Sequence, residues 1–200
     1  MGIYSIKPKF QQSLSPIKKF LIKKKIHPTQ INIFALIISI TGGLALYYAK
    51  EYPLLLIYIP IMAFVRTALN ALDGMIARET KIKNTKFGEV LNEFTDRISD
   101  VVIFLGIAFA PYSSFKISSI AIIIILLNSY LSIVSKAAGG SRQYGGLTGK
   151  ADRMIYLSVA SILVLILNNY EIMNYLMIIL IITTLITMIQ RFFSIKKELT

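Results

Sequence analysis

The stretch NALDGMIARETKIKNTKFGEVLNEFTDRISD, residues 70–100, brings carboxylates together between two long apolar segments. Asp73 stands near the end of the first apolar segment, Glu89, Glu93 and Asp96 stand in the first half of the second, and Asp100 follows one turn later. An ionised side chain inside a bilayer is costly, and it marks a functional site by default. This placement predicts a membrane protein with a polar site carried by two consecutive helices.

The composition of the whole chain supports this class. The chain has 200 residues, of which 55% are hydrophobic, and its mean hydropathy is +0.65. These values are too high for an ordinary soluble domain, and the length suits one compact domain. Cysteine is absent and His27 is the single histidine, so disulfides, thiolate chemistry and a histidine-rich metal site are excluded. The net charge of +12 lies beside apolar segments, which favours anionic lipid head groups over nucleic acid as its partner.

Six apolar segments predict an all-α integral membrane fold. A helix needs about 20 residues to cross the hydrocarbon layer, and a helix satisfies its own backbone hydrogen bonds there. The segments are Ile31–Ala49, Pro53–Ala77, Phe87–Ala110, Ile117–Ala137, Met154–Leu167 and Ile172–Phe193. The fifth is short unless it extends back toward Asp152. We therefore expect six transmembrane helices in a catalytic domain, residues 31–200, preceded by a cytoplasmic basic leader, residues 1–30.

The leader contains a predicted amphipathic helix that starts near Ser15. Ile17, Phe20 and Leu21 share one face of this helix, opposite several lysines. Such a helix lies in the plane of the membrane interface. An unstructured basic tail is the alternative.

Lysine and arginine are distributed unequally between the two sides of the predicted bundle. The leader, the 78–86 and 136–153 connections and the C-terminal tail are basic, whereas the opposite loops hold only Lys50 and Lys116. The second-to-third connection carries Arg78, Lys81, Lys83 and Lys86. Because basic residues accumulate on the cytoplasmic side, we expect a cell-membrane protein with both termini, and the face that carries the site, in the cytoplasm.

Helical spacing places oxygen-bearing side chains on two faces. Asn70 and Asp73 are three residues apart and share a face. Asn92, Asp96 and Asp100 recur every four residues along the next helix, in line with Gly88. Two such faces can surround a cation, and a ligand set of oxygens alone favours Mg²⁺, Mn²⁺ or Ca²⁺ over zinc.

A simpler alternative is that these acids only pair with nearby bases. Arg66 is in range of the neighbourhood of Asp73, and Arg97 follows Glu93 by four residues. Such pairs account for one or two carboxylates but not for the whole cluster.

The spacing resembles the signature of the CDP-alcohol phosphotransferases, a family of integral membrane enzymes. The signature is Asp, two residues, Asp-Gly, two residues, Ala-Arg, a gap of eight or nine residues, Gly, three residues, Asp, three residues and Asp. This chain matches the spacing with Asn70, Asp73, Gly74, Ala77, Arg78, Gly88, Asn92 and Asp96. In this family a hydroxyl attacks a phosphorus of a CDP-linked alcohol and CMP is released.

The resemblance also implies roles for the matching residues. Asn70, Asp73, Asn92 and Asp96 occupy the metal-ligand positions, and Asp96 is the candidate catalytic base. Arg78 would contact phosphate, while Gly74, Ala77 and Gly88 would make room for the nucleotide. The implied cofactor is Mg²⁺ or Mn²⁺, and the implied partners are a CDP-linked lipid, a small polar alcohol and a second copy of the chain in a homodimer.

Two positions depart from the signature, because Asn70 and Asn92 stand where the family has aspartate. An amide oxygen coordinates a hard cation without contributing charge. Either the site holds one ion instead of two, or Glu93 and Asp100 are substitute ligands. The departure also leaves open a non-catalytic relative that binds a CDP-lipid, and buried acids leave open a cation- or proton-coupled transporter.

The segment KAAGGSRQYGGLTGKADR, residues 136–153, is the other candidate for anion binding. Its five glycines predict a flexible loop whose backbone amides and basic side chains suit phosphate. The resemblance implies that its cations hold the phosphate of the lipid or of the acceptor: Lys136, Arg142, Lys150 and Arg153. An ordinary positively charged cytoplasmic loop is the alternative.

Overall fold

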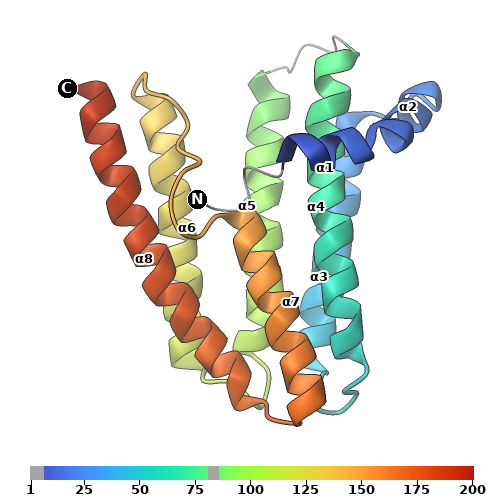
Figure 1. Cartoon of the computed structure of the whole chain (residues 1–200), viewed down its shortest axis with the longest axis vertical. Coiled ribbons are helices and arrows are strands. Elements are labelled where there is room, and N and C mark those ends of the chain that lie inside the picture. Colours follow the sequence, from blue (N-terminus) through green and yellow to red (C-terminus); the bar gives the residue numbers. More distant parts are fainter. Residues whose placement is uncertain (1–6, 81–85) are drawn as a thin grey trace.

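The computed structural model describes residues 7–80 and 86–200, and in that part of the chain it contains eight α-helices and no strand (Figure 1). The helices are α1 Lys7–Ser13, α2 Ser15–Lys23, α3 Pro28–Tyr47, α4 Leu55–Glu79, α5 Lys86–Ala108, α6 Phe115–Ala137, α7 Lys150–Leu167 and α8 Glu171–Leu199. The all-α prediction is confirmed. Lys81 and Lys83, which contributed to the predicted orientation, lie outside the described residues.

Four helices are long and apolar enough to cross a membrane, namely α3, α4, α6 and α8. The other two long helices, α5 and α7, hold the charged residues of the predicted site, which lowers their hydropathy. The fifth predicted segment does extend backwards, because α7 begins at Lys150 rather than at Met154. Apart from that start, the six predicted segments correspond to α3–α8 with small differences at their ends.

The six long helices form a closed ring. Around the ring α3 packs against α5, α5 against α6, α6 against α8, α8 against α7, α7 against α4, and α4 again against α3. Figure 1 shows these helices running side by side along the long axis. The main hydrophobic core fills the part of the bundle nearest the loop between α3 and α4. It includes Leu46, Ile59, Phe104 and Leu157. The polar stretch of α4 and α5 lies toward the opposite end.

Two glycines allow α3 and α5 to approach each other closely. A Cβ atom added to Gly106 would overlap the backbone carbonyl of Gly43, and one added to Gly43 would overlap the carbonyl of Val102. Small residues permit such backbone contact between membrane helices. This contact fixes α5, and with it the carboxylates of α5, against α3.

The N-terminal leader forms two helices where the sequence analysis predicted one. The second, α2, begins at Ser15 as predicted, and Leu14 is buried at the junction of α1 and α2. Phe10 of α1 packs edge-on against Phe64 of α4, with ring centroids 6.0 Å apart. His27 then caps α3, since its Nδ1 accepts from the Thr29 amide at 3.2 Å. The leader is thus attached to the side of α4, as Figure 1 shows.

Candidate active site

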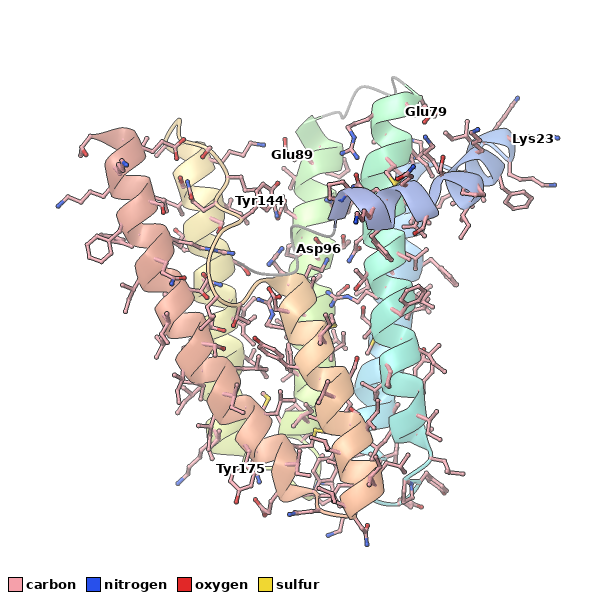
Figure 2. The ribbon with its side chains drawn as sticks, in the orientation of Figure 1. Lys23, Glu79, Glu89, Asp96, Tyr144 and Tyr175 are labelled. Atoms are coloured by element: carbon pink, nitrogen blue, oxygen red, sulfur yellow. The ribbon has the colours of Figure 1, made fainter. Side chains whose placement is uncertain are left out.

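A large cavity exists because α7 starts deep within the bundle. α7 has 18 residues, whereas α4 has 25 and α8 has 29. The segment 138–149 therefore runs from the end of α6 down to the start of α7, which Figure 2 shows beside Asp96. The space beyond the N-terminal end of α7 forms a cavity of about 1160 Å³. It is lined by α1, α4, α5, α6, α7, α8 and this segment.

The lining changes from apolar to polar along α4. Pro60, Ala63 and Phe64 line the cavity in the N-terminal half of the helix, and Asn70, Asp73, Gly74 and Arg78 line it toward the C-terminal end. At about 1.5 Å per residue, Pro60 and Arg78 are roughly 27 Å apart along the helix. Phe10 of α1 and Ile155 of α7 add to the apolar lining. The cavity therefore has two connected parts. The apolar groove is the part lined by Phe10, Pro60, Ala63, Phe64 and Ile155, and the charged chamber is the part lined by Asp73, Arg78, Asp96 and the basic residues around them.

Four of the five oxygen-bearing residues on the two predicted helix faces line the same cavity. Asn70 and Asp73 come from α4, and Asn92 and Asp96 come from α5. Asp73 is buried, and the side chain of Asp96 is 16% exposed. The spatial arrangement that the spacing predicted is present, because α4 and α5 direct these residues toward one chamber. Their roles as metal ligands, and the role of Asp96 as the base, stay predictions.

Lys150 lies directly beside Asp96. Its ammonium Nζ donates to Asp96 Oδ1 at 2.5 Å, and Lys150 is the first residue of α7. The other carboxylate oxygen of Asp96, Oδ2, is 3.9 Å from Nη2 of Arg97. The ammonium of Lys150 thus already places a positive charge beside the carboxylate of Asp96, the candidate base.

Several oxygen atoms at the predicted metal-ligand positions accept no hydrogen bond from the described residues. Asp73 Oδ1 accepts from the Gly74 amide at 2.5 Å, and its second oxygen accepts no hydrogen bond from the described residues. The side chains of Asn70 and Asn92 likewise make no hydrogen bond within the described part of the chain. One carboxylate and two amides, all oxygen donors, suit a hard divalent cation. Among the described residues, no three Asp, Glu or His side chains form a cluster that could hold a metal, so a metal here depends on the amides.

The residues expected to accommodate the nucleotide are only partly in the cavity. Gly74 and Arg78 line it, and a Cβ atom on Gly74 would lie 3.4 Å from Nη1 of Arg78. A side chain at position 74 would thus make only ordinary contact with the guanidinium of Arg78. Ala77 is buried outside the lining, and Gly88 also lies outside it.

Asp100, a proposed substitute ligand, is instead the centre of a buried ion-pair cluster. Arg66 donates to its Oδ1 at 2.6 Å and Arg153 donates to its Oδ2 at 2.6 Å. The three side chains are at most 2% exposed. The ion-pair alternative considered Arg66 near Asp73, but Arg66 pairs with Asp100. Both oxygens of Asp100 are therefore engaged, and Asp100 does not line the cavity.

Glu93, the other proposed substitute, is held by two arginines. Arg142 donates to its Oε2 at 2.9 Å, and Arg97 Nη2 lies 3.7 Å from the same oxygen, as the four-residue spacing predicted. Glu93 does not line the cavity either. The geometry counts against both Glu93 and Asp100 as metal ligands.

The predicted phosphate-binding cations divide into two groups. Arg142, Lys150 and Arg153 line the cavity. Lys136 pairs with Glu89 at the exposed surface and does not line it. Figure 2 shows Glu89 nearer than Asp96 to the N-terminal end of α5.

Arg191 of α8 was not recognised as a site residue from the sequence, although it lines the cavity. It is buried, and its Nη1 donates to Ser132 Oγ at 2.8 Å while its Nε donates to the Gly145 carbonyl at 2.9 Å. An arginine within the last apolar segment was the available signal. Arg97 also lines the cavity, where it donates to Ser129 Oγ at 2.5 Å.

Hydrogen bonds join the glycine-containing segment 138–149 to α8. Glu198 accepts from the Ser141 amide at 2.6 Å and from Gln143 Nε2 at 2.8 Å. Thr187 Oγ1 accepts from the Thr148 amide at 2.9 Å. Gly146, at φ +118°, packs against Thr187, where no Cβ would fit. α8 thus determines where the segment lies over the cavity.

Comparisons with known proteins agree with this architecture. The family model for CDP-alcohol phosphatidyltransferase matches residues 25–190. The chain is 35% identical to the inner membrane protein YnbA of Escherichia coli, over 88% of this chain and 87% of that one. It is 32% identical to archaetidylinositol phosphate synthase of Pyrococcus horikoshii, over 97% of this chain and 96% of that one.

The fold is shared with a solved structure. The crystal structure of Mycobacterium tuberculosis phosphatidylinositol phosphate synthase with CDP-DAG bound superposes with a TM-score of 0.72 at 23% identity, over 92% of this chain and 93% of that one. The same enzyme in complex with manganese and citrate superposes with a TM-score of 0.71. With the matched segment covering α3–α7 and most of α8, this chain belongs to the CDP-alcohol phosphatidyltransferase family and, with it, to phospholipid biosynthesis.

Proposed function

We propose that this protein transfers a phospho-alcohol unit from a CDP-linked lipid to a small polar alcohol and releases CMP. The observation that carries the proposal is the single cavity in which an apolar groove leads to a chamber with Asp73, Asp96 and several cations. A lipid with a nucleotide head group has the same division into apolar and charged parts.

The donor is proposed from the apolar groove. Phe10, Pro60, Ala63, Phe64 and Ile155 offer hydrocarbon surface that a lipid chain can cover. Arg78 and Gly74 in the adjoining chamber suit the pyrophosphate. The CDP-DAG bound to the mycobacterial enzyme supports a CDP-lipid as the donor class.

The acceptor is proposed from the cations of the chamber. Arg97, Arg142, Lys150 and Arg191 line it, and these four cations can provide phosphate contacts in addition to those of Arg78. Guanidinium groups bind phosphate with paired hydrogen bonds. We therefore expect a polyol phosphate, rather than an uncharged polyol or serine, to be the acceptor. The names of several relatives, archaetidylinositol phosphate synthase and phosphatidylinositol phosphate synthase, support this choice.

The proposed chemistry follows from the positions of the side chains. Asp96 takes the proton of the acceptor hydroxyl, whose oxygen attacks the phosphorus that carries the lipid alcohol. The bond from that phosphorus to the bridging oxygen breaks, and CMP leaves with the electron pair. Asp73, Asn70 and Asn92 would hold Mg²⁺ or Mn²⁺, which neutralises charge on the pyrophosphate when bound. Lys150 and Arg142 orient the acceptor beside Asp96.

The membrane arrangement is part of the proposal. We infer that α3–α8 all cross the membrane, because α5 and α7 complete a ring whose other four members are apolar enough to span. Residues 31–200 then form the catalytic domain, and the leader, residues 1–30, lies at the inner interface with α2 as its amphipathic helix. Both termini and the charged chamber would face the cytoplasm, and the assembly would be a homodimer.

A CDP-lipid-binding protein without turnover is the second candidate. The observation that favours it is the Lys150–Asp96 pair, because the ammonium already occupies Oδ1 of the carboxylate that would have to contact the acceptor hydroxyl. Such a protein would bind the CDP-lipid, and its Asp96→Asn variant would behave like the parent.

The test is CMP release from a CDP-lipid in detergent with Mg²⁺ or Mn²⁺, across a panel of polyols and polyol phosphates. We expect release with a polyol phosphate, and Asp96→Asn should lower the rate by about 10²- to 10⁴-fold, as for loss of a general base. Glu89→Gln is the matched control, because Glu89 is on the same helix but outside the cavity. CDP-lipid binding without CMP release from any acceptor would refute the enzyme and support the silent binder.

A further inference from the structure

We propose that the site holds one divalent cation, on the Asp73 side, and that the Lys150 ammonium takes the second cationic position, beside Asp96. This inference rests on the proposed function and adds the cation count of the site and a role for Lys150. It is argued from the charges of the lining residues, from the neighbouring acids and from the contact between Lys150 and Asp96.

The charge of the ligand set leaves no carboxylate for a second dication. Asp73 and Asp96 contribute the two carboxylates, and Asn70 and Asn92 contribute amide oxygens without charge. With the Lys150 ammonium beside Asp96, one dication on the Asp73 side already outweighs the two carboxylates, and a second dication in the same chamber would stand without a compensating carboxylate. The surrounding cations of the chamber add to this excess.

No neighbouring acid supplies the missing charge. Glu93 is engaged by Arg142 and Arg97, and Asp100 is engaged by Arg66 and Arg153. Neither acid lines the cavity. Recruiting Asp100 would leave two buried arginines without their partner, which is costly, and recruiting Glu93 would break its ion pairs with the partly exposed Arg142 and Arg97.

Lys150 already provides a positive charge at Asp96. Its Nζ is 2.5 Å from Asp96 Oδ1, which is hydrogen-bond distance, and its side chain is 25% exposed, within the cavity wall. A divalent ion bound to the same oxygen would meet this ammonium at a distance where like charges repel strongly. The second oxygen of Asp73 and the amide of Asn70 accept no hydrogen bond from described residues, so the Asp73 side is the one open to a metal ion.

Fixing Lys150 in this position is a property of the fold. Lys150 is the first residue of α7, and the preceding residue Gly149 caps that helix through its amide, which donates to Asp152 Oδ2 at 2.8 Å. Lys150 therefore projects from a defined helix start into the chamber. We infer that Lys150 is a positioning residue that supplies the positive charge beside Asp96.

The experiment counts Mn²⁺ ions on the purified full-length protein in detergent. Metal is removed with a chelator, Mn²⁺ is titrated in the presence of saturating CDP, and free Mn²⁺ is followed by its electron paramagnetic resonance signal. We expect one bound ion per chain, with the spectrum of an isolated ion. Two ions per chain, with the spin coupling of metals about 4 Å apart, or no bound ion would overturn the inference.

A variant pair tests the role of Lys150. In the double variant Lys150→Gln, Asn92→Asp the ammonium is removed and a carboxylate is restored, so we expect two bound ions per chain. Lys136→Gln is the matched control with one ion, because Lys136 pairs with Glu89 outside the cavity. A folded double variant that still binds one ion would refute the assignment of Lys150, and the count on the parent protein needs no variant to fold.

CMP release on the same preparation separates this inference from the proposed function. Two ions with CMP release would overturn the inference and leave the transferase intact. One ion without release from any acceptor would support the cation count and refute the transferase.

Discussion

Arg66 and Asp100 form an ion pair of 2.6 Å between α4 and α5, at a depth where each side chain is only 1% exposed. Arg153 of α7 reaches the second oxygen of the same carboxylate, also at 2.6 Å. One aspartate therefore connects three helices that line the cavity. Its position on the same helical stripe as Asn92 and Asp96 suggested a ligand, but its contacts indicate a structural role.

We predict that Asp100→Ala destabilises the protein. Two buried guanidinium groups would lose their partner, and breaking such a pair costs about 3–5 kcal/mol. Thermal unfolding in detergent should show a marked fall in Tm, whereas Glu51→Ala, an exposed acid between α3 and α4, should leave Tm unchanged. Parent-like stability combined with a loss of bound Mn²⁺ would instead make Asp100 a metal ligand.

We predict that Gly106→Ala also lowers stability, for a steric reason. The added methyl group would overlap the Gly43 carbonyl, and separating two packed helices or distorting them costs about 1–3 kcal/mol. Gly145→Ala is the matched control for unfolding, since an added Cβ there meets no atom within 4 Å. Equal Tm values for the two variants would show that α3 and α5 are not in the tight contact described.

Glu93 and Asp73 are predicted to differ in their effect on turnover. Glu93→Gln keeps a hydrogen-bond acceptor for Arg142 and removes a partly exposed ion pair worth about 1 kcal/mol, so CMP release should fall by less than about tenfold. Asp73→Asn should lower release by about 10²- to 10³-fold, as for other losses of charge stabilisation at a reacting centre. Initial rates at saturating Mn²⁺ measure both. A large loss in Glu93→Gln with unchanged Tm would restore Glu93 as a ligand.

Much of this architecture was predictable from local sequence. The apolar segments located six long helices because burial in lipid requires continuous hydrocarbon over each span. The three- and four-residue spacings placed Asn70 with Asp73 and Asn92 with Asp96 because helix geometry alone decides which residues share a face. The start of α7 at Lys150 was only partly predictable, since its first turn is charged.

The contacts between distant helices were not predictable. Lys150 and Asp96 are 54 residues apart, and no local pattern indicates that they meet. The same holds for Arg66 with Asp100 and for Arg191 with Gly145, because each depends on the order of helices around the ring. The glycines of 138–149 suggested mobility, but Glu198 and Thr187, far along the chain, supply the hydrogen bonds that hold the segment.

That attachment leads to the final prediction, which concerns Glu198. Its carboxylate accepts from the Ser141 amide at 2.6 Å, from Ser141 Oγ at 2.9 Å and from Gln143 Nε2 at 2.8 Å. Glu198→Ala removes these bonds, and a hydrogen bond to a charged group contributes about 1.5–3 kcal/mol. Amide hydrogen exchange in residues 139–149 should accelerate by about tenfold or more, a factor that corresponds to about 1.4 kcal/mol.

The same change should affect acceptor binding more than chemistry. Arg142 belongs to the held segment and lines the cavity, so a loosened segment should raise KM for the polyol phosphate while kcat changes little, because Asp96 and Lys150 lie on helices. Lys197→Ala, one residue earlier on α8 and exposed, is the control. Faster exchange without a change in KM would mean that Arg142 does not contact the acceptor. Unchanged exchange would mean that Thr187 and Arg191 hold the segment without Glu198.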